Sequence, residues 1–270
     1  MKEPGGDTTA VPVAEAWRAT QVPLTRPVGA VPALAPPWGF WATLLWSVLV
    51  LGATIAIQVA LIPVAMAVAQ GPNPQIDISR FILDLAEKGW FISLSTLVGT
   101  PVALALIALV VRFRRCPLAD YLGLTRPAPG LLLKAVLGVV GFIVLSDLLT
   151  WLAGRPVVPP FMVNAYRTAG FLPLLVLAVC LAGPLMEESL FRGFMFQGIV
   201  ASRAGAAAAV LITSVSWAAL HIQYDWVGIS TVLTGGILLG ILRIRSGSML
   251  PCLLCHIVVN LVSTVETAIV

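Results

Sequence analysis

Two adjacent glutamates, Glu187 and Glu188, lie in the middle of a stretch that is otherwise almost entirely apolar. Ionisable groups at membrane depth cost several kcal/mol unless they are paired or face a wet cavity, so their presence indicates a functional site. The chain has only two histidines, His221 and His256, and both fall in apolar segments that follow the glutamates. Carboxylates and imidazoles are the usual groups for proton transfer, so this pattern predicts an intramembrane active site.

The spacing around the glutamates predicts different roles for them. Adjacent residues of a helix point about 100° apart, so the two carboxylates are not expected to face one spot. Glu188 and Arg192 are four residues apart and share a helix face, which favours an ion pair between them. Glu187 is then left to face a pocket. The alternative is that both carboxylates only neutralise Arg192 or cap a broken helix, but one arginine does not need two carboxylates.

Each histidine has a partner one helical turn away. Trp217 comes four residues before His221, and Asn260 comes four residues after His256. A single histidine in an apolar helix is more often a core residue with a satisfied hydrogen bond than a catalyst. Here both histidines of the chain follow a helix that carries carboxylates, which favours a role in proton transfer or charge stabilisation.

The run Cys252-Leu-Leu-Cys255-His256 also matches the C-x-x-C-H pattern of covalent haem attachment. That attachment is made on an exported, water-accessible segment, whereas this run begins an apolar helix, so we interpret the match as coincidence. The chain has four cysteines, at positions 116, 180, 252 and 255, and they give no disulfide framework. Three of them lie in apolar segments, where cysteine behaves as a small hydrophobic residue.

The composition excludes a soluble domain. Hydrophobic residues make up 59% of the 270 and charged residues 10%, and the mean hydropathy is +0.99. Average soluble usage is about 25% charged. The net charge of +4 is modest and concentrates in short loops, so it does not indicate nucleic-acid binding.

Apolar runs of about 20 residues, the length that crosses a bilayer, recur along the chain. We therefore predict an all-α, polytopic transmembrane bundle of about seven spans. An eighth span arises if the first run breaks near Pro63. The expected spans cover residues 40–69, 91–111, 131–153, 171–201, 205–222, 227–243 and 248–269.

Three parts of the chain are distinguished. Residues 1–37 are rich in Pro, Gly, Ala and Thr and have no apolar core, which predicts a disordered tail and not a signal peptide. Residues 38–165 hold the first transmembrane helices and a basic cytoplasmic loop, and residues 166–270 form the catalytic core. Between the first two spans, residues 78–88 mix apolar and charged side chains, as in a helix that lies in the membrane interface.

The distribution of basic residues predicts the orientation of the bundle. Eight basic residues fall in loops on one side of a seven-span chain, and four fall on the other. Cytoplasmic loops carry the excess of Lys and Arg, so we place the N-terminus in the cytoplasm and the protein in the plasma membrane of a bacterium. The eight are Arg112, Arg114, Arg115, Arg126, Lys134, Arg203, Arg243 and Arg245, and the four are Arg80, Lys88, Arg155 and Arg167.

The fourth and fifth spans are expected to form a hairpin that turns near Ala204 or Gly205. Glu187 lies about as far before that turn as His221 lies after it, so an antiparallel pair sets them at similar depth. His256 enters from the seventh span, close to Pro251. Two further acidic residues lie at depth, Asp147 in the third span and Glu266 in the seventh; whether Asp147 orients a site residue or lines a wet cavity stays open.

Three motifs in this order, Glu187-Glu188-x-x-x-Arg192, aromatic-x-x-x-His221 and His256-x-x-x-Asn260, resemble the CAAX protease and bacteriocin-processing family. These intramembrane proteases include the type II CAAX prenyl endopeptidases and the abortive-infection proteins. The resemblance covers roughly Phe171 to Thr264. The family usually has Phe four residues before its first histidine, where this chain has Trp217, a change that keeps an aromatic wall.

The resemblance and the residues lead to one mechanism. Glu187 acts as general base on a water that His221 helps to position, since a carboxylate in a low-dielectric pocket suits that task. His256 and the amide of Asn260 donate hydrogen bonds to the oxyanion. Glu188 is counted among the catalytic residues as well, with Arg192 and Trp217 as supporting residues. No cofactor is expected in this scheme.

The alternative is a zinc metalloprotease that uses the same residues. Glu187, His221 and His256 would then make a His₂Glu set with an open fourth position. We favour the metal-free scheme because these residues come from three helices and lack the H-E-x-x-H spacing.

Two classes of non-enzyme remain as alternatives. One is a membrane scaffold or immunity protein that keeps the motifs for structure, and the other is a proton-coupled transporter. Transporters of that kind tend to show repeated halves, and this chain has no internal repeat. The expected partners are the lipid bilayer and a membrane protein or lipidated peptide substrate, and the resemblance adds a prenylated CAAX-type peptide as one candidate.

Overall fold

The described structure consists only of helices, joined by turns and loops. It is a computed structural model that describes residues 38–70, 77–128 and 130–270, so the tail predicted for residues 1–37 lies outside the described residues. No strand occurs within these three ranges. The helices are α2 (Phe40–Gln70), α3 (Ile78–Ala86), α4 (Gly89–Phe113), α5 (Leu118–Leu122), α6 (Leu131–Leu152), α7 (Pro160–Arg167), α8 (Leu172–Leu177), η1 (Ala178–Ala182), α9 (Gly183–Glu188), η2 (Ser189–Met195), α10 (Phe196–Val200), α11 (Gly205–Ala219), α12 (Trp226–Ser246) and α13 (Leu250–Ala268).

Six of the helical stretches in the described ranges are long and apolar enough to cross a membrane. They are α2, α4, α6, the continuous stretch from α8 to α10, α12 and α13, and the shorter apolar helix α11 adds a seventh. The prediction of an all-α multi-pass membrane protein with about seven spans is confirmed. Helix α2 continues through Pro63 without a break, so the alternative of an eighth span does not arise there.

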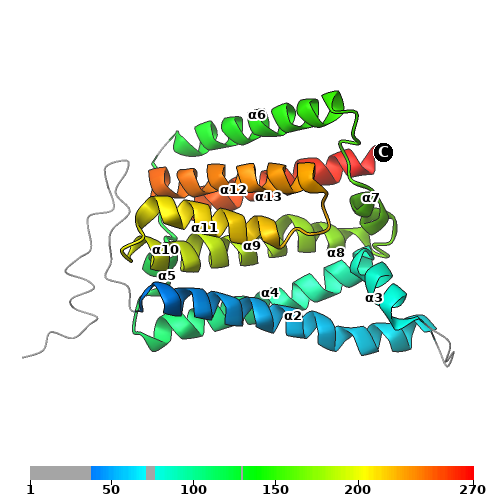
Figure 1. The fold of residues 1–270 in the computed structure, drawn as a ribbon, viewed down its shortest axis with the longest axis horizontal. Helices are drawn as coiled ribbons and strands as arrows, with labels where there is room; N and C mark the ends of the chain where they lie inside the picture. The colour runs from blue at the N-terminus through cyan, green and yellow to red at the C-terminus, as the bar shows by residue number, and fades with distance from the viewer. Residues whose placement is uncertain (1–37, 71–76, 129) are drawn as a thin grey trace, which may run out of the picture.

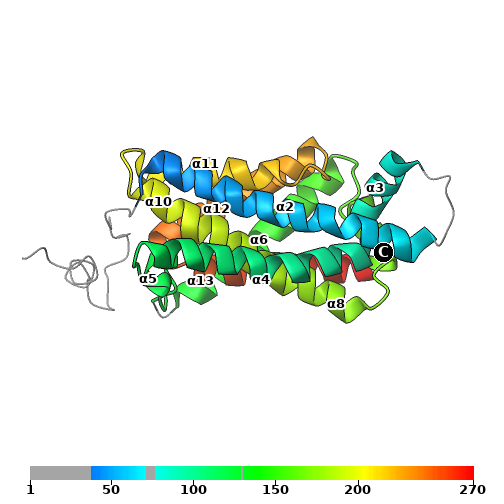
Figure 2. The ribbon, with the colours of Figure 1, turned by 90° about the horizontal axis from the view of Figure 1, so that it is seen from below.

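The helix from α8 to α10 lies in the middle of the bundle (Figures 1 and 2). Helices α2 and α4 lie along one edge in Figure 1, and α6 lies along the opposite edge. Half of the most apolar window of Leu172–Val200 is buried, against 6% for α6. The glutamate motif is therefore carried by the most enclosed span, while α6 has most of its surface free to face lipid.

Two π-helical segments interrupt this central helix, η1 before the glutamates and η2 after them. Pro184 has no N–H, and its ring collides with the carbonyl four residues earlier in a regular helix. The wider turn of η1, which ends two residues before Pro184, relieves that conflict. π-Helical turns inside α-helices are frequent at functional sites.

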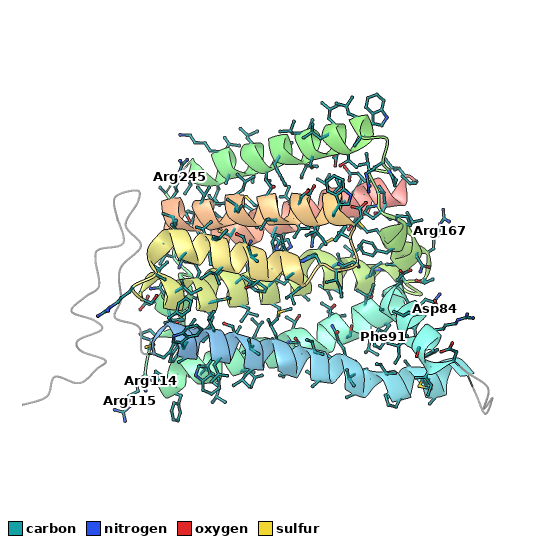
Figure 3. All side chains as sticks on the ribbon, viewed as in Figure 1. Asp84, Phe91, Arg114, Arg115, Arg167 and Arg245 are labelled. Atoms are coloured by element: carbon teal, nitrogen blue, oxygen red, sulfur yellow. The ribbon has the colours of Figure 1, made fainter. Side chains whose placement is uncertain are left out.

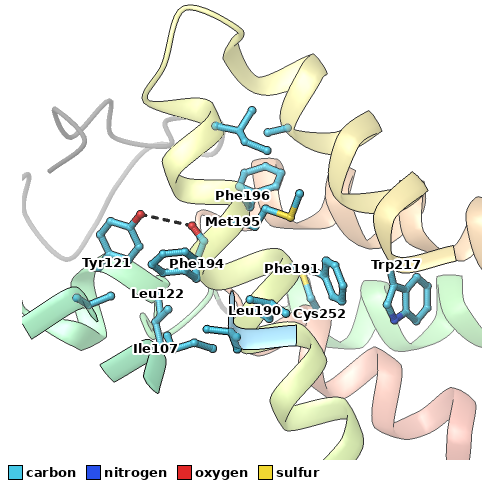
Figure 4. Packing of buried hydrophobic residues seen from close by; sticks show 14 of the residues in the cluster. Ile107, Tyr121, Leu122, Leu190, Phe191, Phe194, Met195, Phe196, Trp217 and Cys252 are labelled. Atoms are coloured by element: carbon cyan, nitrogen blue, oxygen red, sulfur yellow. Dashed lines mark hydrogen bonds between the residues drawn. The ribbon is translucent and has the colours of Figure 1, made fainter. Parts of the chain in front are cut away.

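The side chains of η2 and α10 form the centre of the apolar core. Phe191, Phe194 and Phe196 are completely buried, and Figure 4 shows them packed with Ile107, Leu122 and Cys252. The hydroxyl of Tyr121 donates a hydrogen bond to the carbonyl of Phe194 at 3.4 Å. This packing holds in place the part of the central helix that lies between the glutamates and the hairpin turn.

The hairpin between α10 and α11 turns where the sequence predicts. Gly205 begins α11 with a φ of +74°, a backbone conformation that residues other than glycine rarely adopt. The segment expected in the membrane interface forms α3, whose first turn is capped by the Asp77 carboxylate.

The charged ends of the bundle differ, as the loop pattern predicts. In Figure 3, Arg114, Arg115 and Arg245 lie at one end, and Asp84 and Arg167 lie at the other. The antiparallel order of the spans brings all eight basic residues named above to the first of these ends. The predicted separation of charge is therefore present in the fold.

Candidate active site

Glu188 and Arg192 form the expected ion pair across one turn of the central helix. Arg192 Nη1 lies 3.1 Å from Glu188 Oε1, and both side chains are completely buried. The guanidinium also donates from Nη2 to the carbonyl of Gly236 on α12 at 3.3 Å, and its Cζ lies 4.5 Å from the centre of the Trp217 ring. Arg192 thus links the central helix to α11 and α12.

His256 on α13 reaches both glutamates with its two ring nitrogens. Nδ1 lies 2.9 Å from Glu188 Oε1, and Nε2 lies 4.0 Å from Glu187 Oε2. The expectation that two adjacent glutamates cannot share a target is wrong for this ring, because the imidazole lies between their diverging side chains. With Nδ1–H donating to Glu188, the ring presents Nε2 toward Glu187, and a hydrogen on Nε2 can donate to a group that lies there.

Glu187 is the accessible member of the pair. Its side chain is 23% exposed, whereas that of Glu188 is 0% exposed. Its Oε2 accepts a hydrogen bond of 2.5 Å from the indole N–H of Trp217 on α11. The 4.0 Å that separate Glu187 Oε2 from His256 Nε2 are a distance that one water molecule can bridge. A carboxylate that is held on one oxygen and partly exposed is suited to proton abstraction.

His221 lies just beyond the end of α11, in the turn that leads to α12, although the sequence predicts helix up to residue 222. Its Nδ1 is 2.9 Å from the carbonyl of Trp217, and its ring meets the Trp217 ring edge-on at a centroid distance of 5.1 Å. Its hydrogen bond thus goes to a backbone carbonyl and not to a carboxylate. The structure brings His221 to the site through Trp217.

Tyr224 is a site neighbour that the sequence reasoning missed. Its ring stacks on His221 at a centroid distance of 6.0 Å, and its hydroxyl contacts the sulfur of Met162 at 3.8 Å. Burial, with a smaller contribution from the charge of Glu187, raises the pKa of Tyr224 to about 12. The phenol is therefore neutral at ordinary pH. The only sequence signal was its position three residues after His221.

Helix α7 covers this end of the site. Phe161 packs edge-on against Tyr224 with ring centroids 4.9 Å apart. Just before α7, Arg155 forms an ion pair with Asp225, and its guanidinium lies 5.4 Å from the centre of the Trp226 ring. The loop that holds His221 and Tyr224 is thereby fastened to the segment between α6 and α7.

Asn260 lies one turn after His256, as expected, but its amide serves the central helix. Nδ2 donates to the carbonyl of Val179 in η1 at 2.8 Å. A π-helical turn disturbs the regular backbone pairing, and the amide of Asn260 supplies a donor there. Thr100 does the same for the carbonyl of Ala182 at 3.2 Å. An amide NH₂ carries two hydrogens, so one such bond uses half of the donors of Asn260.

Asp147 on α6 interacts with Glu266 on α13, which is not a histidine or arginine of the site. This contact therefore does not orient a residue of the site, which was one of the two roles left open for Asp147.

The zinc alternative is not supported by the arrangement of the side chains. Within the described ranges, no group of three or more His, Cys, Asp or Glu side chains is spaced to hold a metal ion. Glu187 and His256 approach each other, but His221 does not complete a His₂Glu set with them. We therefore derive no step of the reaction through a metal.

An apolar groove of about 540 Å³ opens between α8, η1 and α13. Its lining carries almost no polar surface and includes none of the glutamates or histidines. Apart from the thiol of Cys180, the groove has no titratable group, so the candidate active site is the cluster around Glu187.

Part of the chain matches a family of known proteins. Residues 169–262 match the family model described as "Type II CAAX prenyl endopeptidase Rce1-like". This confirms the resemblance drawn from the motifs between Phe171 and Thr264, and all seven predicted site residues fall within it. No curated protein and no solved structure matches the chain.

Proposed function

We propose that the protein is an intramembrane endopeptidase that hydrolyses peptide bonds of membrane-associated substrates by a glutamate-activated water. The match to an endopeptidase family supports a hydrolase. A multi-pass bundle that carries its polar groups on enclosed spans supports a reaction within the membrane. We further propose the plasma membrane of a bacterium as its location, with the N-terminus and the basic loops in the cytoplasm.

One observation carries this proposal: two adjacent carboxylates differ in exposure and partners. Glu188 is fully buried, ion-paired with Arg192 and bonded to His256. Glu187 is 23% exposed, with His256 Nε2 at 4.0 Å. A structural ion pair needs only the first of these carboxylates. The second is placed where a water molecule can lie between a base and an imidazole.

The proposed reaction begins when Glu187 takes a proton from this water as the oxygen attacks the carbonyl carbon of the scissile bond. The C–O π electrons move to oxygen, and hydrogen-bond donors stabilise the resulting oxyanion. Glu187 then returns the proton to the leaving nitrogen as the C–N bond breaks. His221 helps to position the water, and His256 and Asn260 are the proposed oxyanion donors.

Glu188 acts on the reaction through His256. Its carboxylate accepts from Nδ1 and thereby fixes the orientation of the ring. Arg192 compensates the charge of Glu188 and keeps that carboxylate in place. We therefore assign Glu188 and Arg192 as positioning residues, and we keep the term catalytic for Glu187, His221, His256 and Asn260.

The substrate class is proposed at two levels. The broad proposal is a membrane protein or a lipidated peptide, because the site lies in the bundle and a peptide must reach it from the bilayer or its surface. The finer proposal, a prenylated CAAX-type peptide, rests on the description of the matching family alone.

The test uses purified protein with a fluorescently labelled peptide library that contains prenylated and unmodified members. We expect the wild type to cleave a subset and Glu187→Ala to cleave none, with and without a chelator. A scaffold or immunity protein would show no cleavage by either protein. Cleavage that a chelator stops and zinc restores would replace the metal-free scheme with the zinc alternative.

A further inference from the structure

Trp217 occupies the centre of the candidate site. Its side chain is buried, and it contacts four other site residues that come from different parts of the chain. The indole N–H bonds to Glu187, the ring face meets the Arg192 guanidinium, and the ring edges meet His221 at 5.1 Å and His256 at 5.2 Å. Figure 4 places Trp217 on α11 at the end of the buried cluster, beyond Phe191.

The surroundings hold the indole in one orientation. A side-chain carbon at Gly236 would lie 3.1 Å from Trp217 Cε3, so the glycine on α12 makes room for the ring. The same glycine accepts a hydrogen bond from Arg192, whose guanidinium lies over the indole. With the ring fixed between these groups, its single N–H points at Glu187.

This hydrogen bond has a chemical consequence for Glu187. An indole N–H only donates and does not titrate in water, so it cannot compete for the proton that the base removes. It takes one lone pair of Oε2 and stabilises negative charge there, and the second lone pair of Oε2 remains available to the water between Glu187 and His256. A phenylalanine, the usual residue of the resembling family at this position, keeps an aromatic ring but has no donor.

We propose that Trp217 is a positioning residue that orients the carboxylate of Glu187 for proton abstraction through its indole N–H. This role rests on the proposed function of Glu187 as general base. The indole does not need to touch the substrate, so it acts on turnover and not on substrate binding. In this chain, Trp217 therefore both packs against the site and orients its general base.

The test compares two replacements that remove the donor. Trp217→Phe leaves a smaller ring, and replacement by benzothienylalanine keeps the bicyclic shape with sulfur in place of N–H. We expect kcat to fall about 10- to 100-fold in both, the usual effect of losing a hydrogen bond to a charged group, while KM stays within about twofold. Trp151→Phe is the matched control, since Trp151 is 66% exposed on α6.

A second measurement needs no activity. The chain has eight tryptophans, so ¹⁵N-tryptophan labelling gives eight indole N–H signals in an NMR spectrum, and Trp217→Phe identifies one of them. We expect this signal to lie downfield of the exposed indoles and to move upfield in Glu187→Gln. A signal that does not respond to Glu187→Gln would overturn the hydrogen bond.

The two measurements separate the failure of this inference from failure of the proposed function. Wild-type kcat in the benzothienylalanine protein would overturn the positioning role while Glu187 remains the base. Equal hydrolysis by wild type and Glu187→Gln would overturn the proposed function, and the role of Trp217 with it. Loss of thermal stability with unchanged kcat would show that Trp217 is only a packing residue.

Discussion

Removal of either member of the Glu188–Arg192 pair should destabilise the fold strongly. Both side chains are completely buried, so the partner that remains cannot regain water. After Glu188→Ala, the Arg192 guanidinium keeps only the Gly236 carbonyl and the face of Trp217, neither of which carries a charge. After Arg192→Ala, Glu188 keeps only the imidazole of His256.

The expected magnitude follows from this burial. Breaking a buried ion pair by removing one partner costs about 3–5 kcal/mol in soluble proteins, because the remaining charge is uncompensated. The pair formed by Arg155 and Asp225 is the matched control. Its side chains are 36% and 52% exposed, so Arg155→Ala should cost less than about 1 kcal/mol.

The assay is equilibrium unfolding in mixed micelles, followed by tryptophan fluorescence, for both single variants and for Glu188→Gln/Arg192→Met. The double variant removes both charges, keeps an acceptor for His256 and should recover most of the loss. Single variants that unfold within about 1 kcal/mol of the wild type would refute the argument that this pair is a buried electrostatic link. A double variant whose loss is the sum of the single losses would do the same.

Three further predictions concern the proposed oxyanion donors and the metal. Asn260→Ala should lower turnover by about 10²–10³, the usual cost of one oxyanion donor. It should also lower the melting temperature, because the carbonyl of Val179 in η1 loses its hydrogen-bond donor. A lower melting temperature with unchanged turnover would leave Asn260 a structural role only. His256→Gln, which keeps a hydrogen-bond donor, should retain more activity than His256→Ala, and equal loss in both would argue against donation by His256. Elemental analysis of the purified protein should find no stoichiometric zinc, whereas zinc that is lost in both His221→Ala and His256→Ala would contradict the metal-free scheme.

The fold was largely predictable from run lengths and spacing. Apolar runs of about membrane-spanning length locate the six long apolar stretches of the described ranges and the shorter apolar helix α11. The turn before Gly205 follows from the break between two of these runs. The Glu188–Arg192 pair was predictable because an i, i+4 spacing fixes which residues share a helix face. The collection of basic loops at one end followed from counting spans.

The details of the site were less predictable, because they depend on departures from regular helix. The π-helical segments on either side of the glutamates change the register of the central helix, and no periodicity in the sequence marks them. Trp217, and not His221, makes the direct contact with Glu187, since α11 ends at Ala219 and His221 lies in the turn that follows. His256 reaches both glutamates because it packs between them, which requires knowledge of how α13 lies against α9.

The central claim is that Glu187 activates the water that cleaves the peptide. The most direct measurement is the rate of peptide cleavage by wild type and Glu187→Gln in proteoliposomes, at equal concentrations of folded protein verified by thermal unfolding. Gln keeps an acceptor for Trp217 but cannot take a proton, so we expect the rate to fall by about 10²–10⁴, the usual contribution of a general base, with the melting temperature unchanged. A Glu187→Gln protein that is folded and cleaves the peptide near the wild-type rate would contradict the account.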